Sequence, residues 1–198
     1  VVLLHNGRVV KQGEPAAVIS EYHKLLIGCS ELQVREEESE PKDSSLVSNG
    51  LNRWGSKEIE ILEVIFFDKD GTETNFFKTA EPFRVRVKYL AHGKIAKPVF
   101  GLAIYSDKGV HITGPNTKLQ GFPIDSLEGK GWIEYRVESL PLLPGTYIFS
   151  AAVYDFSGFQ AYDHCEKHWN FHVLESEKTA ERYGLITIPS QWKIEPEK

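Results

Sequence analysis

The stretch FRVRVKY at residues 83–89 decides how this sequence folds. Apolar and basic side chains alternate along it, and successive side chains of a β-strand point to opposite faces of a sheet. The pattern therefore predicts a half-buried strand, with its Phe, Val and Tyr side chains toward a core and its Arg and Lys side chains toward solvent. A helix is excluded here, because the apolar positions of a helix recur every three to four residues.

Similar alternation continues along the chain after this stretch, with turn-forming residues between the runs. Many short strands divided by turns predict an antiparallel sandwich or barrel. Leu140 to Tyr147 resembles the corner of immunoglobulin-like domains, where a Pro-Gly turn precedes a strand with an early tyrosine, so Tyr147 is expected to be structural. We expect an all-β fold, an immunoglobulin-like antiparallel β-sandwich of about eight strands. The further strands are expected at residues 100–105, 132–138, 147–154 and 169–173.

The first 52 residues differ from the rest of the chain. Residues 1–27 contain two short apolar strands around Asn6-Gly7, a pair that favours a hairpin turn, and then apolar residues at helical spacing. This strand-turn-strand-helix segment precedes the sandwich and is too small to fold alone. Residues 28–52 lose the periodicity and carry an acidic, polar run, which is typical of a solvated linker. The sandwich is expected over residues 53–198.

Composition narrows the classes of function. The net charge of −5 argues against a sequence-independent grip on nucleic acid or anionic lipid, and it leaves neutral sugars open. No apolar run approaches the ~18 residues that a membrane span needs. Cys29 and Cys165 lie far apart and form no CxxC, so a reducing compartment fits better than a disulfide framework.

Two parts of the sequence resemble parts of one transporter family. Residues 3–26 look like the closing stretch of an ABC ATPase domain, and residues 53–192 are similar to the C-terminal domain of Wzt, the ATPase subunit of O-antigen polysaccharide exporters. In the first part the matching positions are Gly7, Val9, Gly13, Pro15, Val18, Ile19 and Tyr22. In the second they are Arg53-Trp54-Gly55, PVFGLAIY at 98–105, ITGPNT at 112–117, LLPGTYIFSAAVYD at 142–155 and the terminal Gly184…Trp192.

The resemblance implies a division of the chain and a role. Residues 1–27 would be the end of an ABC ATPase domain, 28–52 a linker, and 53–198 a carbohydrate-binding β-sandwich. The implied ligand is the O-antigen polysaccharide, selected as export cargo at the cytoplasmic face of the bacterial inner membrane. The implied protein partners are a second copy of the chain and, through the parent ATPase domain, the membrane subunit of the transporter. The sequence has no GxxxxGK[ST] phosphate loop, so the chain is expected to be non-catalytic and to use no cofactor.

A sugar site needs an aromatic ring for sugar C–H groups and side chains that donate and accept hydrogen bonds. In the strands at 100–105 and 147–154, small residues and tyrosines would share the face turned away from the core, which suits a shallow groove. We expect the rings of Tyr105, Trp132 and Tyr154 to line one exposed wall as stacking faces. Hydrogen bonds are expected from Asn116, Thr117, Arg136 and Ser150.

The small residues have an alternative explanation, which is that they make room for another sheet or a second subunit. The chain would then be a dimerisation module that pairs two ATPase subunits. Residues 184–188 are apolar and strand-like, and could cross to the partner chain.

His164, Cys165, His168 and His172 look like metal ligands at first sight. However, the alternation of Trp169, Phe171 and Val173 predicts a strand, on which the outer two histidines lie about 26 Å apart. No metal site is therefore expected there. Nothing fixes a pair of carboxylates or an activated nucleophile either, so we expect no enzyme.

Overall fold

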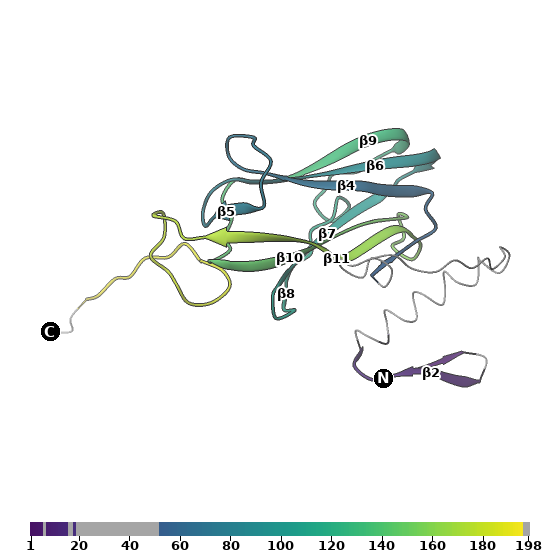
Figure 1. Ribbon diagram of the computed structural model, residues 1–198, viewed down its shortest axis with the longest axis horizontal. Helices are drawn as coiled ribbons and strands as arrows, with labels where there is room; N and C mark the ends of the chain where they lie inside the picture. The colour runs from purple at the N-terminus through teal and green to yellow at the C-terminus, as the bar shows by residue number, and fades with distance from the viewer. Residues whose placement is uncertain (6, 16–17, 19–51, 196–198) are drawn as a thin grey trace, which may run out of the picture.

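A computed structural model describes residues 1–5, 7–15, 18 and 52–195 of the chain. Two β-sheets pack face to face, one above the other in Figure 1. The larger sheet contains, in spatial order, β3 (Arg53–Trp54), β11 (Ala161–Leu174), β10 (Gly145–Tyr154), β7 (Val99–Ser106) and β8 (His111–Thr113). The smaller sheet contains β4 (Ile59–Phe67), β6 (Phe83–Ala96) and β9 (Ser126–Val137).

The pairing is antiparallel between neighbours in both sheets. β5 (Phe76–Lys78) joins the larger sheet beside β11, to which it runs parallel. The expected all-β sandwich is thus confirmed, with one parallel pair among the described strands.

The core lies between the two sheets and is rich in aromatic rings. Phe83 and Val85 on β6 are fully buried, as their alternation predicts. Phe66 of the smaller sheet contacts Phe149 of the larger sheet edge-on, with ring centroids 5.2 Å apart. It also contacts Phe171, at 5.6 Å. Because these rings come from both sheets, their burial holds the two layers together.

Tyr147 occupies the corner that leads into β10. Its hydroxyl donates a hydrogen bond of 2.6 Å to the carbonyl oxygen of Leu143, four residues upstream, and its ring is buried. This is the tyrosine corner of immunoglobulin-like sandwiches, so the expected structural role of Tyr147 is confirmed. The C-terminal segment closes over the same corner, because the Leu143 N–H donates to Leu185 O and the Thr187 N–H donates to Pro141 O.

The N-terminal residues form a separate hairpin of β1 (Val2–His5) and β2 (Arg8–Gln12). Gly7 stands in the turn with a φ of 75°, which glycine adopts without strain. The predicted strand-turn-strand is therefore confirmed. The helix that was expected to follow lies mostly outside the described residues, as does most of the 28–52 linker. The division at residues 27 and 52 stays a prediction.

A buried ion cluster centred on Asp163 joins the two sheets at one edge. Asp163, on β11, has no exposed surface, and both its oxygens accept hydrogen bonds from the Arg53 guanidinium, at 3.0 and 2.6 Å. The Lys57 ammonium forms an ion pair with the same carboxylate. The backbone N–H of Ile61, on β4 of the other sheet, donates to it at 2.8 Å. Burial alone would raise the pKa of Asp163, but these hydrogen bonds outweigh it and lower the pKa.

Replacing this carboxylate should destabilise the fold in a pH-dependent way. We expect Asp163→Asn to cost about 2–3 kcal/mol at pH 7. This is less than the usual loss for a broken buried pair, because Arg53 and Lys57 are partly exposed and can rehydrate. The folded-state pKa lies below the unfolded value of about 3.9. The contribution is therefore present above pH 4 and is lost as the pH falls through the folded-state pKa.

Urea unfolding of wild type and variant between pH 3 and 7 measures this difference. Asp107→Asn, in an exposed turn, is the matched control and should leave stability unchanged. A wild type and an Asp163→Asn variant of equal stability at pH 7 would contradict the role given to the cluster.

Candidate functional site

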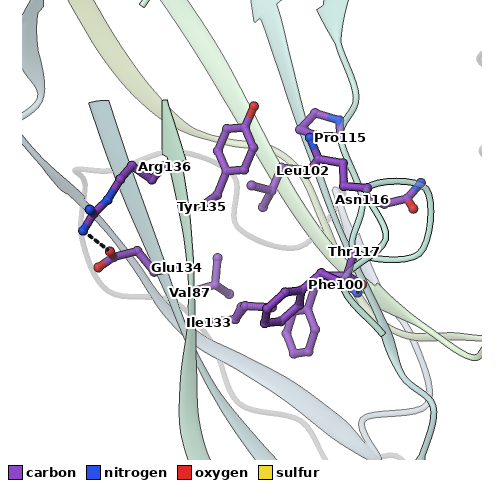
Figure 2. A pocket seen from close by; sticks show the side chains of 12 residues that line it. Val87, Phe100, Leu102, Pro115, Asn116, Thr117, Ile133, Glu134, Tyr135 and Arg136 are labelled. Atoms are coloured by element: carbon purple, nitrogen blue, oxygen red, sulfur yellow. Dashed lines mark hydrogen bonds and ion pairs between the residues drawn. The ribbon is translucent and has the colours of Figure 1, made fainter. Parts of the chain in front are cut away.

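A groove opens at the edge of the sandwich opposite to Asp163. It lies between β9, the edge strand of the smaller sheet, and β7 with the segment 115–122 of the larger sheet (Figure 2). The cavity measures about 520 Å³. Phe100 and Leu102 form its floor, so the groove reaches down to the edge of the core.

β9 supplies the aromatic side of the groove. Tyr135 pairs with Val85 and Ile133 pairs with Val87, so both side chains face the space between the sheets. Because β9 is an edge strand, Tyr135 is half-buried and lines the groove without being sealed in the core. Burial raises the pKa of its hydroxyl, which stays protonated at neutral pH. The hydroxyl makes no hydrogen bond to the described residues, so it can serve a ligand.

The opposite wall is the segment 115–122, which runs beside β7. The Leu102 N–H donates to Pro115 O, and the Thr117 N–H donates to Phe100 O. The Thr117 hydroxyl in turn accepts from the Phe100 N–H at 3.2 Å. Asn116 accepts the Leu119 N–H at 2.8 Å through its side-chain oxygen. Asn116 and Thr117 therefore line this groove, although these oxygens already hold the wall in shape. Their hydrogen bonds to a sugar stay a prediction.

Charged side chains form the rim on the outer side of β9. Glu134 accepts hydrogen bonds from Arg86 at 3.0 Å and from Arg136 at 3.3 Å. Burial would raise the pKa of Glu134, but the two guanidinium groups lower it, so the carboxylate is ionised at neutral pH. Figure 2 shows Glu134 and Arg136 across β9 from the ring of Tyr135. Charged and aromatic groups thus border the same edge strand.

Trp132 lies on the outer face of the smaller sheet, opposite Lys88. Its ring is 57% exposed, and the Arg86 guanidinium stands 4.3 Å above the ring centroid. The cation–π contact fixes an open aromatic surface two residues from Glu134 on the same strand, and Arg86 contacts both. Trp132 therefore lies near the rim of the groove, and it does not line the cavity.

Tyr105, Ser150 and Tyr154 lie on the outer face of the larger sheet. Tyr105 is paired with Ile148, whereas Tyr154 is paired with Val99, six residues further along β10. The two tyrosines are therefore about 20 Å apart.

Their side chains are already engaged. Tyr105 stacks on His111, and the Tyr154 hydroxyl is 2.7 Å from the Nδ1 of His164. The Ser150 hydroxyl is buried and accepts the Lys167 N–H at 2.6 Å.

The expectation that Tyr105, Trp132 and Tyr154 line one wall is wrong. Trp132 belongs to the smaller sheet and the tyrosines to the larger one, and the outer faces of two packed sheets point in opposite directions. Of the seven predicted residues, the structure brings Asn116, Thr117 and Arg136 together at the groove. Tyr135 was missed, because its alternation with Ile133 marked it as a core residue.

The chain is similar to known proteins of one family. The Wzt C-terminal domain family matches residues 51–188. Among solved structures, the chain is similar to the crystal structure of the C-terminal domain of Wzt, at 17% identity and a TM-score of 0.61. That match covers 71% of this chain and 86% of the other. No curated protein sequence matches the chain significantly.

Two further solved structures resemble the chain only weakly. One is the Pseudomonas fluorescens alkylpurine DNA glycosylase AlkC bound to DNA, at 12% identity and a TM-score of 0.37, covering 59% of this chain and 30% of the other. The other is the CARDB domain of the PF1109 protein from Pyrococcus furiosus, at 10% identity and a TM-score of 0.32. It covers 59% of this chain and 97% of the other.

The chain is thus a β-sandwich domain with a groove of ligand size between the edge strand β9 and β7. Since the family match extends over most of the sandwich and more than half of the chain, the chain belongs to the Wzt C-terminal domain family. In the part of the chain that the structure describes, no helix is long and apolar enough to cross a bilayer.

Proposed function

We propose that this chain binds the O-antigen polysaccharide and thereby selects it as cargo for export by an ABC transporter. Membership of the Wzt C-terminal domain family supports a role in the O-antigen ABC transporter. In this proposal the chain is non-catalytic and works at the cytoplasmic face of the inner membrane. A parent ATPase domain, of which residues 1–27 would be the end, connects it to the membrane subunit.

The observation that carries the proposal is the groove beside Tyr135. Its volume of about 520 Å³ falls within the range of small-molecule sites, and it offers an aromatic ring and polar groups together. A sugar ring has C–H faces that pack on aromatic rings and hydroxyls that need both donors and acceptors. Tyr135 provides a ring and a hydroxyl, while Arg136 and Glu134 provide a donor and an acceptor at the rim.

The other predicted residues take different places in this proposal. Asn116 and Thr117 shape the wall that faces Tyr135. Trp132 offers a second stacking face around the edge of β9, where a longer chain would continue. Contacts from Tyr105, Ser150 and Tyr154 stay a prediction, and they would involve a separate stretch of polysaccharide on the other sheet. An open groove that holds a few sugars would bind with roughly −4 to −6 kcal/mol, near millimolar to tens of micromolar.

Titration with polysaccharides from O-antigen-producing bacteria tests the groove. For a polysaccharide that the wild type binds, we expect Tyr135→Ala to weaken affinity at least fivefold, or about 1 kcal/mol, because the stacking ring is lost. Tyr135→Phe keeps the ring and should have a smaller effect. Trp132→Ala tests the rim, and Tyr154→Ala tests the opposite face of the molecule.

Thermal unfolding of each variant establishes that it is folded. If the folded Tyr135→Ala variant binds as tightly as wild type while Tyr154→Ala does not, the site lies on the larger sheet and the groove is the wrong place. If no polysaccharide of the panel binds the wild type, cargo recognition by this chain is refuted.

A second candidate function, pairing of two ATPase subunits, is favoured by the C-terminal segment. After the contacts of Leu185 and Thr187 with the tyrosine corner, the chain presents large apolar side chains to solvent. Trp192 is fully exposed, and Ile194 is 91% exposed. Exposed apolar groups gathered in one segment are typical of surfaces that meet another protein. The same strand contacts could form with a partner chain, as a domain swap.

Deletion of residues 184–198 tests the swap by measuring the mass in solution with light scattering. We expect a monomer, because the deletion removes both the crossing strand and the apolar tail. A shorter deletion of residues 189–198 keeps the bonds at Leu185 and Thr187, and so separates loss of the tail from loss of the corner contacts. A dimer that persists after removal of residues 184–198 would count against exchange of this strand.

A further inference from the structure

A second hollow adjoins the groove. It measures about 550 Å³ and shares two lining residues with the groove, Thr117 and Phe122. The Phe122 side chain is 61% exposed and borders both hollows. A ligand longer than the groove can therefore pass this ring and enter the second space.

Two lysines set the charge of the second hollow. Lys118 and Lys97 lie over the ring of Phe156, with their Nζ atoms 4.1 and 5.7 Å from its centroid. The Lys118 ammonium also donates to Phe156 O at 2.9 Å. Lys97 forms no side-chain hydrogen bond or ion pair with the described residues. Asp125 contributes one carboxylate to the lining, so the two lysines leave the hollow positively charged.

The backbone at Lys97 supports a use for its side chain. Lys97 has a φ of 48°, a region that glycine and asparagine adopt more readily than lysine. Its N–H donates to Asp125 O at 3.0 Å, which holds the residue in this conformation in the connection between β6 and β7. The hydrogen bond to Asp125 therefore keeps Lys97 in a backbone conformation that costs a lysine energy. Residues with strained backbone angles are frequent at ligand sites.

We propose that this second hollow, the Lys97–Lys118 pocket, binds an anionic group of a saccharide chain whose neighbouring unit occupies the groove. The inference rests on the proposed function and names the ligand class more closely, as a sugar that carries a carboxylate or a phosphate ester. The two ammonium groups pair with the anion, and the ring of Phe156 holds the two lysines beside each other. Val99 and Ile124 add apolar surface beside the two lysines, which stay exposed and donate charge-assisted hydrogen bonds to the anion.

Paired charged and neutral probes test the pocket on the full chain. The carboxylate pair is an oligogalacturonate and its carboxyl-reduced, neutral counterpart, and the phosphate pair is mannose 6-phosphate and mannose. The wild type should bind at least one charged probe tenfold more tightly than its neutral counterpart. The pair of probes that shows this difference in affinity identifies the anion as a carboxylate or a phosphate ester.

The double variant Lys97→Asn and Lys118→Gln removes both charges, and asparagine suits the backbone at position 97. It should lose at least tenfold in affinity for the charged probe and less than twofold for the neutral one. The matched control is Lys108→Gln, an exposed lysine beyond the other end of β7, which should leave both affinities unchanged.

The other outcomes are decisive as well. A wild type that binds charged and neutral probes equally overturns the pocket, and so does a double variant that loses both affinities equally or neither. Tyr135→Ala separates this inference from the proposed groove. If Tyr135→Ala leaves all affinities unchanged while the double variant loses only the charged probe, the groove is refuted and the anion pocket stands.

Discussion

The fold depends on a single buried carboxylate that reaches across both sheets. Asp163 sits on β11, accepts hydrogen bonds from Arg53 on β3, and accepts the backbone N–H of Ile61 on the edge strand of the other sheet. Arg53 also donates to Ile61 O at 2.8 Å, so both backbone groups of Ile61 are satisfied by this cluster. A charge without exposed surface is tolerated only when it is fully paired, and the cluster therefore closes this edge of the sandwich. The groove lies at the opposite edge, where no such cluster joins the sheets in the described part of the chain.

The Arg53-Trp54-Gly55 motif, on which part of the family resemblance rests, has a structural explanation at each position. Arg53 neutralises Asp163, and Trp54 stacks on His164 with ring centroids 4.0 Å apart. A Cβ atom on Gly55 would lie 2.3 Å from the carbonyl oxygen of Tyr162, and its φ of 140° also favours glycine. These residues fasten the start of the sandwich to β11 and do not line the groove. In this chain the motif therefore has a structural role, and it lies outside the groove.

The sequence predicted the local features of the fold well, and it named three of the residues that line the groove but not where the groove lies. Alternation in residues 83–89 correctly separated core from solvent positions, and the Pro-Gly turn before Tyr147 correctly indicated the tyrosine corner, because both patterns depend on neighbours in the chain. Which sheet each strand joins depends on contacts between distant residues. Trp132 was therefore placed on the same wall as Tyr105, although β9 pairs with β6 and not with β7. Tyr135 was assigned to the core for the same reason, since alternation does not show that its strand lies at an edge.

The position of the groove at a strand edge constrains the shape of the proposed ligand. Inward and outward side chains of β9 alternate, and at an edge both sets border the same opening, as Tyr135 and Arg136 do. A polysaccharide with flat sugar faces and hydroxyls at the edges of its rings can stack on Tyr135 inside the groove and bond the charged side chains outside it. Each such contact is weak, because the groove is open and water competes for the polar groups. A polymer that presents many identical units to two copies of the chain gains avidity without stronger individual contacts. In the proposed function, cargo recognition and subunit pairing would therefore be complementary, since pairing would raise the effective affinity for the polymer.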